Sequence, residues 1–171
     1  WDVHTEHGVI NAEVVVNAGG LWARELGRMV GVELPLLPME HQYVITEELP
    51  EIVDHGAEIA VTIDYEGGVY TRQEGNGLLV GTYEKAGRPW SVDTTPTDFG
   101  MRLLTPDLER FADRIEVAQQ RMPALATAGI ARVVNGPFTF APDGNPLIGP
   151  VPGIRNYWVA CAVMAGFCQA G

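Results

Sequence analysis

Residues 8–31, GVINAEVVVNAGGLWARELGRMVG, contain the stretch that decides the fold. Their first part, Gly8 to Asn17, ends in an unbroken run of valines, which is typical of a strand buried on both faces of a parallel sheet. Two glycines follow, and Gly31 is a natural helix stop. The apolar residues between them are spaced for one helical face: Leu21, Leu26, Met29 and Val30. This stretch predicts a buried strand, a tight glycine turn and a helix.

The middle of the chain has a different pattern. From Glu40 onward, short segments rich in Tyr, Val, Ile and Thr alternate with Gly, Pro, Asp and Asn: HQYVIT, AEIAVTI, GVYTRQ and GLLVGTY. Such segments indicate an antiparallel sheet, and Gly75-Asn76-Gly77 indicates a short hairpin turn. We therefore expect a second architecture after the first strand and helix.

One helix and three further segments complete the expected organisation. Thr105 as N-cap and Pro106 at the first helical position predict a helix that ends before Pro123. Residues 130–134 are predicted to form a strand, whereas GPFTFAPDGNPLIGPVPG after them is too broken to be regular throughout. Tyr157 to Ala160 reads as a strand, followed by a small-residue segment that enters a helix. The fold class is therefore α+β, a mixed α/β arrangement.

Composition excludes several classes of protein. With 46% hydrophobic residues, a net charge of -11 and a pI near 4.6, the chain has no basic surface suited to nucleic acid. No apolar run is long enough to suggest a membrane helix. Cys161 and Cys168 fit neither a disulfide framework nor a zinc site, and we expect no metal site. A start at Trp1, without Met, favours an internal piece of a longer protein.

Three segments together carry a family resemblance: VVNAGGLWAREL, PMEHQYVIT, and GPFTFAPDGNPLIGP with NYWVA. In this order they resemble the D-amino-acid oxidase and glycine oxidase superfamily, most closely its dimethylglycine and sarcosine dehydrogenase branch. The resemblance implies an antiparallel substrate-binding sheet flanked by parts of a Rossmann-like FAD-binding domain. The domains would then be residues 1–38 for FAD, 39–139 for substrate and 140–171 for the return to the FAD domain.

The resemblance also implies contacts with FAD. The chain has no G-x-G-x-x-G motif, which would lie upstream, so we expect the parent protein to supply the main pyrophosphate cradle. In the strand turn, glycines either let the backbone approach the flavin or only allow close packing of strand and helix. The later loop either approaches the isoalloxazine ring or is a plain surface turn. The implied cofactor-binding residues are Asn17, Ala18, Gly19, Gly20, Asp143, Gly144, Pro146 and Gly166.

Four residues of the middle segments are candidates for the substrate site. The resemblance places His41 and Tyr70 at the active site, where imidazole suits proton transfer and a phenol suits hydrogen bonding. Arg72 lies two residues beyond Tyr70, hence on the same strand face, where it either holds a substrate carboxylate or pairs with a nearby Glu. Tyr43 shares the face of His41, and it either lines the site or packs.

In this branch a hydride equivalent passes from an N-methyl carbon to flavin, and water or tetrahydrofolate intercepts the resulting iminium. The expected substrate is dimethylglycine, sarcosine or a similar small N-methylated amino acid, and a C-terminal folate domain outside this chain is a further expectation. A parent that is a non-catalytic phosphatase regulatory subunit, or an oxidase of another amine, remains the alternative. We expect a mitochondrial matrix location in a eukaryote and a cytoplasmic one in a bacterium.

Overall fold

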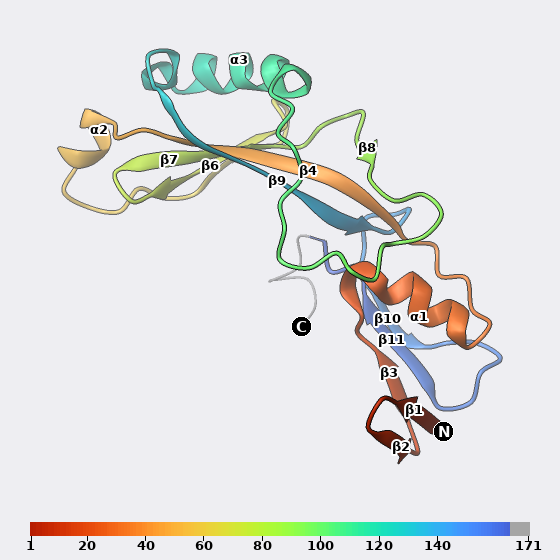
Figure 1. Cartoon of the computed structure of the whole chain (residues 1–171). Helices are drawn as coiled ribbons and strands as arrows, with labels where there is room; N and C mark the ends of the chain where they lie inside the picture. Colours follow the sequence, from red (N-terminus) through yellow and green to blue (C-terminus); the bar gives the residue numbers. More distant parts are fainter. Residues whose placement is uncertain (165–171) are drawn as a thin grey trace. The chain divides into compact units, whose positions relative to one another are not determined.

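A computed structural model of the chain describes residues 1–164, which divide into two compact units. The first unit contains residues 1–39, 89–100 and the chain from 137 onward, and the second contains residues 40–88 and 101–136. Figure 1 shows the helices and strands of both units. Residues 89–100 group with the first unit, although the sequence placed them in the middle segment.

The first unit is built on a three-stranded sheet with the order β10-β11-β3. Strand β10 (Leu147–Pro150) is antiparallel to β11 (Tyr157–Cys161), and β11 is parallel to β3 (Val15–Asn17). Helix η1 (Gly20–Trp22) and helix α1 (Ala23–Met29) follow β3, so the predicted strand, glycine turn and helix are confirmed. The core of this unit includes Ala23, Leu34, Tyr157 and Val159.

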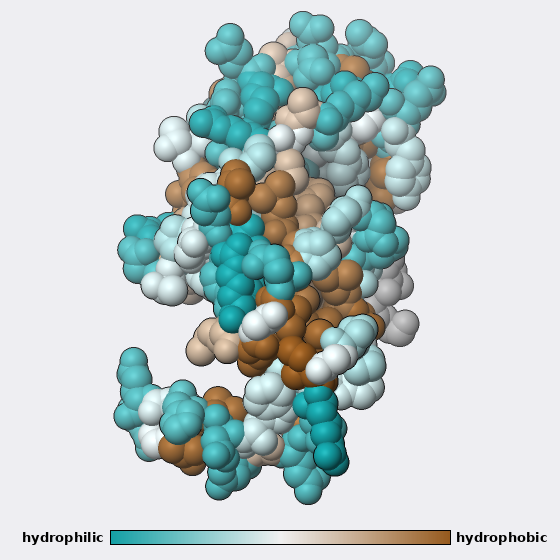
Figure 2. Space-filling model, turned by 90° about the vertical axis from the view of Figure 1, so that its right-hand side faces the viewer, coloured by the Kyte–Doolittle hydropathy of each residue, from teal (hydrophilic) through white to brown (hydrophobic). Residues whose placement is uncertain are grey.

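Two details of the first prediction are wrong. The expected strand over residues 8–17 is divided, because β1 (Asp2–Thr5) and β2 (Gly8–Asn11) form a separate hairpin. Val16 is 57% exposed, and its partner Trp158 on the central strand β11 is 43% exposed, because the sheet face that carries both is not covered within the described residues. Apolar side chains are likewise visible on the surface drawn in Figure 2.

The buried face of α1 also differs from the prediction. Gly31 has a φ of +78° and the helix ends just before it, as expected. Met29 is 80% exposed, however, and the buried residues of α1 are Ala23, Arg24 and Gly27. A Cβ at Gly27 would lie 2.8 Å from the Val32 carbonyl oxygen. The absence of a side chain at Gly27 therefore lets the helix backbone approach closely, and Val30 just after the helix still packs against the core, as predicted.

The second unit contains most of a six-stranded sheet with the order β5-β6-β7-β4-β8, in which β9 also pairs with β4. Neighbouring strands from β5 to β4 are antiparallel, as predicted. Gly75 and Asn76 form the turn between β6 and β7, where Glu74 pairs with Gly77. The strands are β4 (Leu37–Thr46), β5 (Thr62–Asp64), β6 (Val69–Glu74), β7 (Gly77–Thr82), β8 (Arg88–Pro89) and β9 (Ile130–Phe140).

Helix α3 (Ala112–Arg121) lies along one face of this sheet, over β6 and β7 (Figure 1). The core between them includes Val44, Val80, Phe111 and Ala118. Short helices also belong to this unit: α2 (Pro50–Val53), η2 (Glu109–Phe111) and η3 (Pro123–Ala126). We call the sheet face opposite α3 the outer face.

The helix around residue 110 begins later than predicted, at Glu109 and not near Pro106. The side chain of Gln42 explains the delay, because it exchanges two hydrogen bonds with the main chain of Asp107, at 2.6 and 3.1 Å. The predicted end before Pro123 is confirmed. Strand β9 is longer than predicted and continues to Phe140, through the beginning of the stretch 136–153 that was expected to be irregular in part. No helix of residues 1–164 is both long and apolar enough to cross a membrane.

Candidate substrate and cofactor sites

The outer face of the second unit carries a row of aromatic side chains. Tyr43 of β4 and Tyr70 of β6 both pair with Gly81 of β7, which lies between them. The Tyr70 ring covers Gly81 so closely that a Cβ at Gly81 would overlap it. The glycine thus makes room for a tyrosine ring to lie flat against the sheet.

His41 extends this row along β4, and Tyr83 lies beside it, one residue beyond the end of β7. Their ring centroids are 6.2 Å apart with an interplanar angle of 30°. Tyr83 also contacts Tyr70, at a centroid distance of 5.3 Å. The structure therefore brings His41, Tyr43, Tyr70 and Tyr83 together, and we call these four residues the aromatic face. Tyr83 was missed by the sequence analysis, although its position two residues after Gly81 signals the same side of β7.

Protonation preferences within the aromatic face follow from burial and nearby charge. Burial, followed by the positive charge of Arg110, lowers the pKa of His41. Burial, followed by the neighbouring Tyr83 and Tyr43, raises the pKa of Tyr70 to about 12. At neutral pH the face therefore offers a neutral imidazole that can accept a proton beside a phenol that can donate a hydrogen bond.

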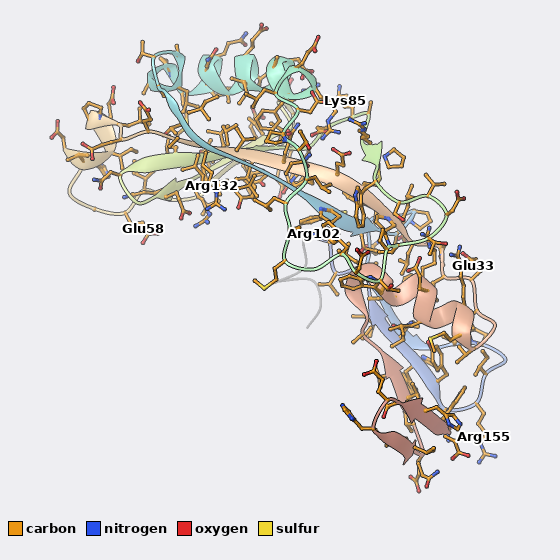
Figure 3. All side chains as sticks on the ribbon, in the orientation of Figure 1. Glu33, Glu58, Lys85, Arg102, Arg132 and Arg155 are labelled. Atoms are coloured by element: carbon orange, nitrogen blue, oxygen red, sulfur yellow. The ribbon has the colours of Figure 1, made fainter. Side chains whose placement is uncertain are left out.

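Two arginines lie on the outer face. Arg72 of β6 forms an ion pair with Glu74, at 2.7 Å, and the two side chains are 51% and 40% exposed. Arg132 of β9 is exposed, and Figure 3 shows its side chain on the side of the sheet away from α3. Among residues 1–164 Arg132 makes no ion pair or hydrogen bond. Arg132 was not among the predicted site residues, because the sequence pattern of residues 130–134 does not show which sheet face each side chain joins.

The first unit has a hollow of about 380 Å³ next to the glycine turn. Ala18 and Gly20 line it, and Gly20 has a φ of +55° with open space where a Cβ would stand. A Cβ at Gly19 would instead lie 2.5 Å from Leu26 Cδ1. The two roles expected of the glycines therefore fall to different residues. Gly19 allows the strand and the helix to pack closely, and Gly20 leaves the backbone open to the hollow. The other lining residues are Leu21, Pro137, Phe138, Thr139, Ala160, Cys161, Ala162, Val163 and Met164.

Asn17 shapes this turn from inside. Its side chain is buried, donates to the Ala23 carbonyl at 2.8 Å and accepts from the Gly19 N–H at 3.1 Å. These bonds fasten the end of β3 to the start of α1. The Asn17 side chain therefore holds the turn in shape.

The loop with Asp143, Gly144 and Pro146 lies before β10 and does not line this hollow. Asp143 accepts a hydrogen bond from the Asn145 N–H at 3.0 Å, which lowers the pKa of Asp143. Gly144 has a φ of +72°, and its N–H donates to the Ala141 carbonyl. This is a self-contained turn. Gly166 lies outside the described residues.

The hollow has room for part of a bound FAD, and its lining suits such a contact. Its volume is within the usual range of cofactor pockets, and its walls are mainly small or apolar. Exposed backbone at Ala18 and Gly20 would let amides approach a cofactor closely, as flavin sites require. FAD itself supplies the redox chemistry when it is bound.

Comparison with known proteins identifies the family of the chain. The family described as DAO, FAD dependent oxidoreductase, matches residues 1–171, and the chain belongs to this family. It is 45% identical to mitochondrial dimethylglycine dehydrogenase of Mus musculus over 176 residues, covering 100% of this chain and 20% of that protein. Mitochondrial sarcosine dehydrogenase of the same species is 39% identical over 169 residues, covering 99% and 17%.

Among solved structures, L-proline dehydrogenase from P. horikoshii superposes with a TM-score of 0.74 and 28% identity, covering 99% of this chain and 42% of that one. The fold is therefore that of the FAD-dependent oxidoreductases. The chain spans only about a fifth of the length of the dehydrogenases that it matches.

Proposed function

We propose that the protein containing this chain oxidises an N-methyl group of dimethylglycine, sarcosine or a similar amine and passes the electrons to FAD. The observation that carries the proposal is the contact of His41 and Tyr70 with one Tyr83 ring on the outer face. A proton acceptor and a hydrogen-bond donor are thereby placed side by side on rigid strands. Family membership and the two dehydrogenase relatives support the same chemistry.

In this proposal His41 prepares the substrate. An N-methyl amino acid is an ammonium ion at neutral pH, and its lone pair must be free before the methyl carbon gives up a hydride equivalent. The lowered pKa of His41, due to burial and then to Arg110, leaves a neutral imidazole that accepts the ammonium proton. Tyr70 keeps its proton because its pKa is raised to about 12, so its phenol donates to the substrate.

The substrate carboxylate needs a cation, and we assign Arg72 to this role. Its exposed ion pair with Glu74 contributes about 1 kcal/mol or less, so a substrate carboxylate can displace Glu74. A guanidinium also offers the planar fork that matches a carboxylate. Tyr43 would line the same face beside His41.

The first unit would contact the cofactor. Ala18 and Gly20 present open backbone to the hollow, while Asn17 and Gly19 keep the turn compact. Asp143, Gly144, Pro146 and Gly166 remain proposed cofactor contacts from the family resemblance. Tetrahydrofolate, through a further domain, remains a proposed acceptor of the one-carbon product. A mitochondrial matrix location in a eukaryote is proposed from the mitochondrial relatives.

The visible absorption spectrum of the full-length protein tests the proposal. It is recorded before and after anaerobic addition of dimethylglycine and then sarcosine. Flavin bands that bleach with either amine are the expected result, and the relative rates rank the two substrates. Flavin bands that neither amine changes would overturn the proposal and favour another amine or a non-catalytic regulatory role.

A further inference from the structure

Two carboxylates share one arginine near His41. Glu40 lies next to His41 in β4, and Glu84 lies two residues beyond the end of β7. Because side chains alternate along a strand, Glu40 points away from the face that carries His41. Burial raises the pKa of Glu84 and the negative charge of Glu40 adds to this effect, so the two carboxylates repel each other unless a cation lies between them.

Arg110 of η2 bridges this pair. Its Nη1 lies 3.3 Å from Glu40 Oε2, and its Nε lies 3.1 Å from Glu84 Oε2. The side chains of Arg110, Glu40 and Glu84 are only 17%, 12% and 8% exposed, so solvent screens these contacts weakly. Glu40 is also held from the side by the Asn135 amide, which donates to Oε2 at 3.0 Å. One guanidinium thus joins β4, next to His41, to the segment that follows β7.

The position of Arg110 is itself set by β4. The backbone N–H of Arg110 donates to Asp107 Oδ1 at 3.2 Å. The main chain of Asp107 in turn forms two hydrogen bonds with the Gln42 side chain. Gln42 is completely buried and immediately follows His41 in the chain. The guanidinium is therefore anchored to the strand segment whose other side presents the imidazole.

We propose that Arg110 is a positioning residue for His41, because its ion pairs with Glu40 and Glu84 hold β4 to the segment after β7 that carries Tyr83, and so set the His41 ring against Tyr83. The consequence for catalysis rests on the proposed function. The Arg110 charge adds to the burial that lowers the pKa of His41. The other titratable or charged groups that the proposal places around His41 are Tyr43, Tyr70 and Tyr83 on its own face and Glu40, Glu84 and Arg88 behind it.

The experiment compares three variants of the full-length, FAD-loaded protein: Arg110→Gln, Arg110→Lys and Arg121→Gln. Arg121 is the matched control, because it lies at the end of α3 and forms an ion pair with Asp64 at 2.8 Å. Hydrogen–deuterium exchange at the His41 ring, followed by mass spectrometry, measures the pKa of His41 without requiring turnover. Steady-state kinetics with dimethylglycine and sarcosine measures kcat and KM.

Arg110→Gln is expected to raise the pKa of His41 and to lower kcat about tenfold or more with little change in KM. Arg110→Lys keeps the charge but cannot span both carboxylates, so the pKa should stay near the wild-type value while kcat still falls. If Arg110→Gln does not fold, Arg110→Lys still tests whether the ion pairs of Arg110 with Glu40 and Glu84 are needed. Arg121→Gln should change neither quantity.

A His41 pKa that is unchanged in Arg110→Gln, or a wild-type kcat in Arg110→Lys, would overturn the positioning role. A wild-type protein that oxidises neither amine would instead overturn the proposed function, and the pKa comparison would still decide the role of Arg110. The two failures are therefore distinguishable.

Discussion

His41 and Tyr70 lie on one sheet face with opposite protonation preferences. Burial disfavours the charged form of both side chains. The charged form is the protonated one for histidine, so burial lowers the pKa of His41, and the deprotonated one for tyrosine, so burial raises the pKa of Tyr70. A single apolar surrounding therefore yields an acceptor and a donor at neutral pH. The sequence indicated both residues through a family resemblance, while their shared neighbour Tyr83 emerged only from the pairing of β4 with β7.

His41→Ala in the full-length protein should lower kcat by about 100-fold or more, because general base catalysis contributes that much. The midpoint of thermal unfolding should change little, since the ring is only partly buried at the sheet surface. Both quantities are measured on the same FAD-loaded sample. Equal losses of turnover and stability would show that His41 is a structural residue.

Arg72→Lys should raise the KM for dimethylglycine several-fold, because a point charge replaces a bidentate fork. Arg132→Lys is the comparison, since Arg132 lies on the same outer face without an ion pair among the described residues. Steady-state kinetics of both variants decides which arginine holds the carboxylate. A raised KM in Arg132→Lys alone would transfer the role from Arg72 to Arg132.

At the scale of elements, the hairpin of β6 and β7 gathers the substrate candidates. Period-two alternation predicts that Tyr70 and Arg72 share a face, and the turn at Gly75 and Asn76 sets the register between the strands. That register places Gly81 beneath the Tyr70 ring. The sequence shows that the strand contains a glycine at position 81. That the glycine makes room for the Tyr70 ring is known only once the partner strand is known.

Gly81→Ala should displace the Tyr70 ring, because the new Cβ overlaps it. The ring can turn away, so we expect a loss of stability of about 1 to 3 kcal/mol together with a large loss of kcat. Thermal unfolding and steady-state kinetics measure the two effects. An alanine variant with wild-type kcat would exclude a requirement for this position of Tyr70.

At the scale of the whole molecule, the chain divides its tasks between two units. The first presents a glycine turn and a hollow, and the second presents the aromatic face on an antiparallel sheet. Segment 89–100 belongs to the first unit because the buried Arg24 donates to the carbonyls of Ser91 and Val92, while Glu25 accepts from the Thr95 N–H. No local pattern in that segment indicates these contacts.

The unfolding free energy should fall as the pH drops below about 6.5, the ordinary pKa of histidine. The folded protein holds the pKa of His41 below that value, so the unfolded chain binds more protons in this range. Glu84 has the opposite effect on the unfolding free energy at lower pH, because burial raises its pKa in the folded protein. Thermal unfolding of wild type and His41→Gln from about pH 8 to about pH 5.5 isolates the histidine. A pH dependence that is identical in both would contradict a lowered His41 pKa.

The sequence by itself determined the order of strand, glycine turn and helix, the antiparallel character of the middle segment, and the family. These features depend on short-range periodicity and on residues that allow tight turns, so they are readable along the chain. Only the tertiary structure decided that Tyr83 joins His41, that Arg110 bridges Glu40 and Glu84, and that Val16 and Met29 are exposed. Each of these depends on which distant segments pair or pack, because burial and charge contacts arise between elements and not within them.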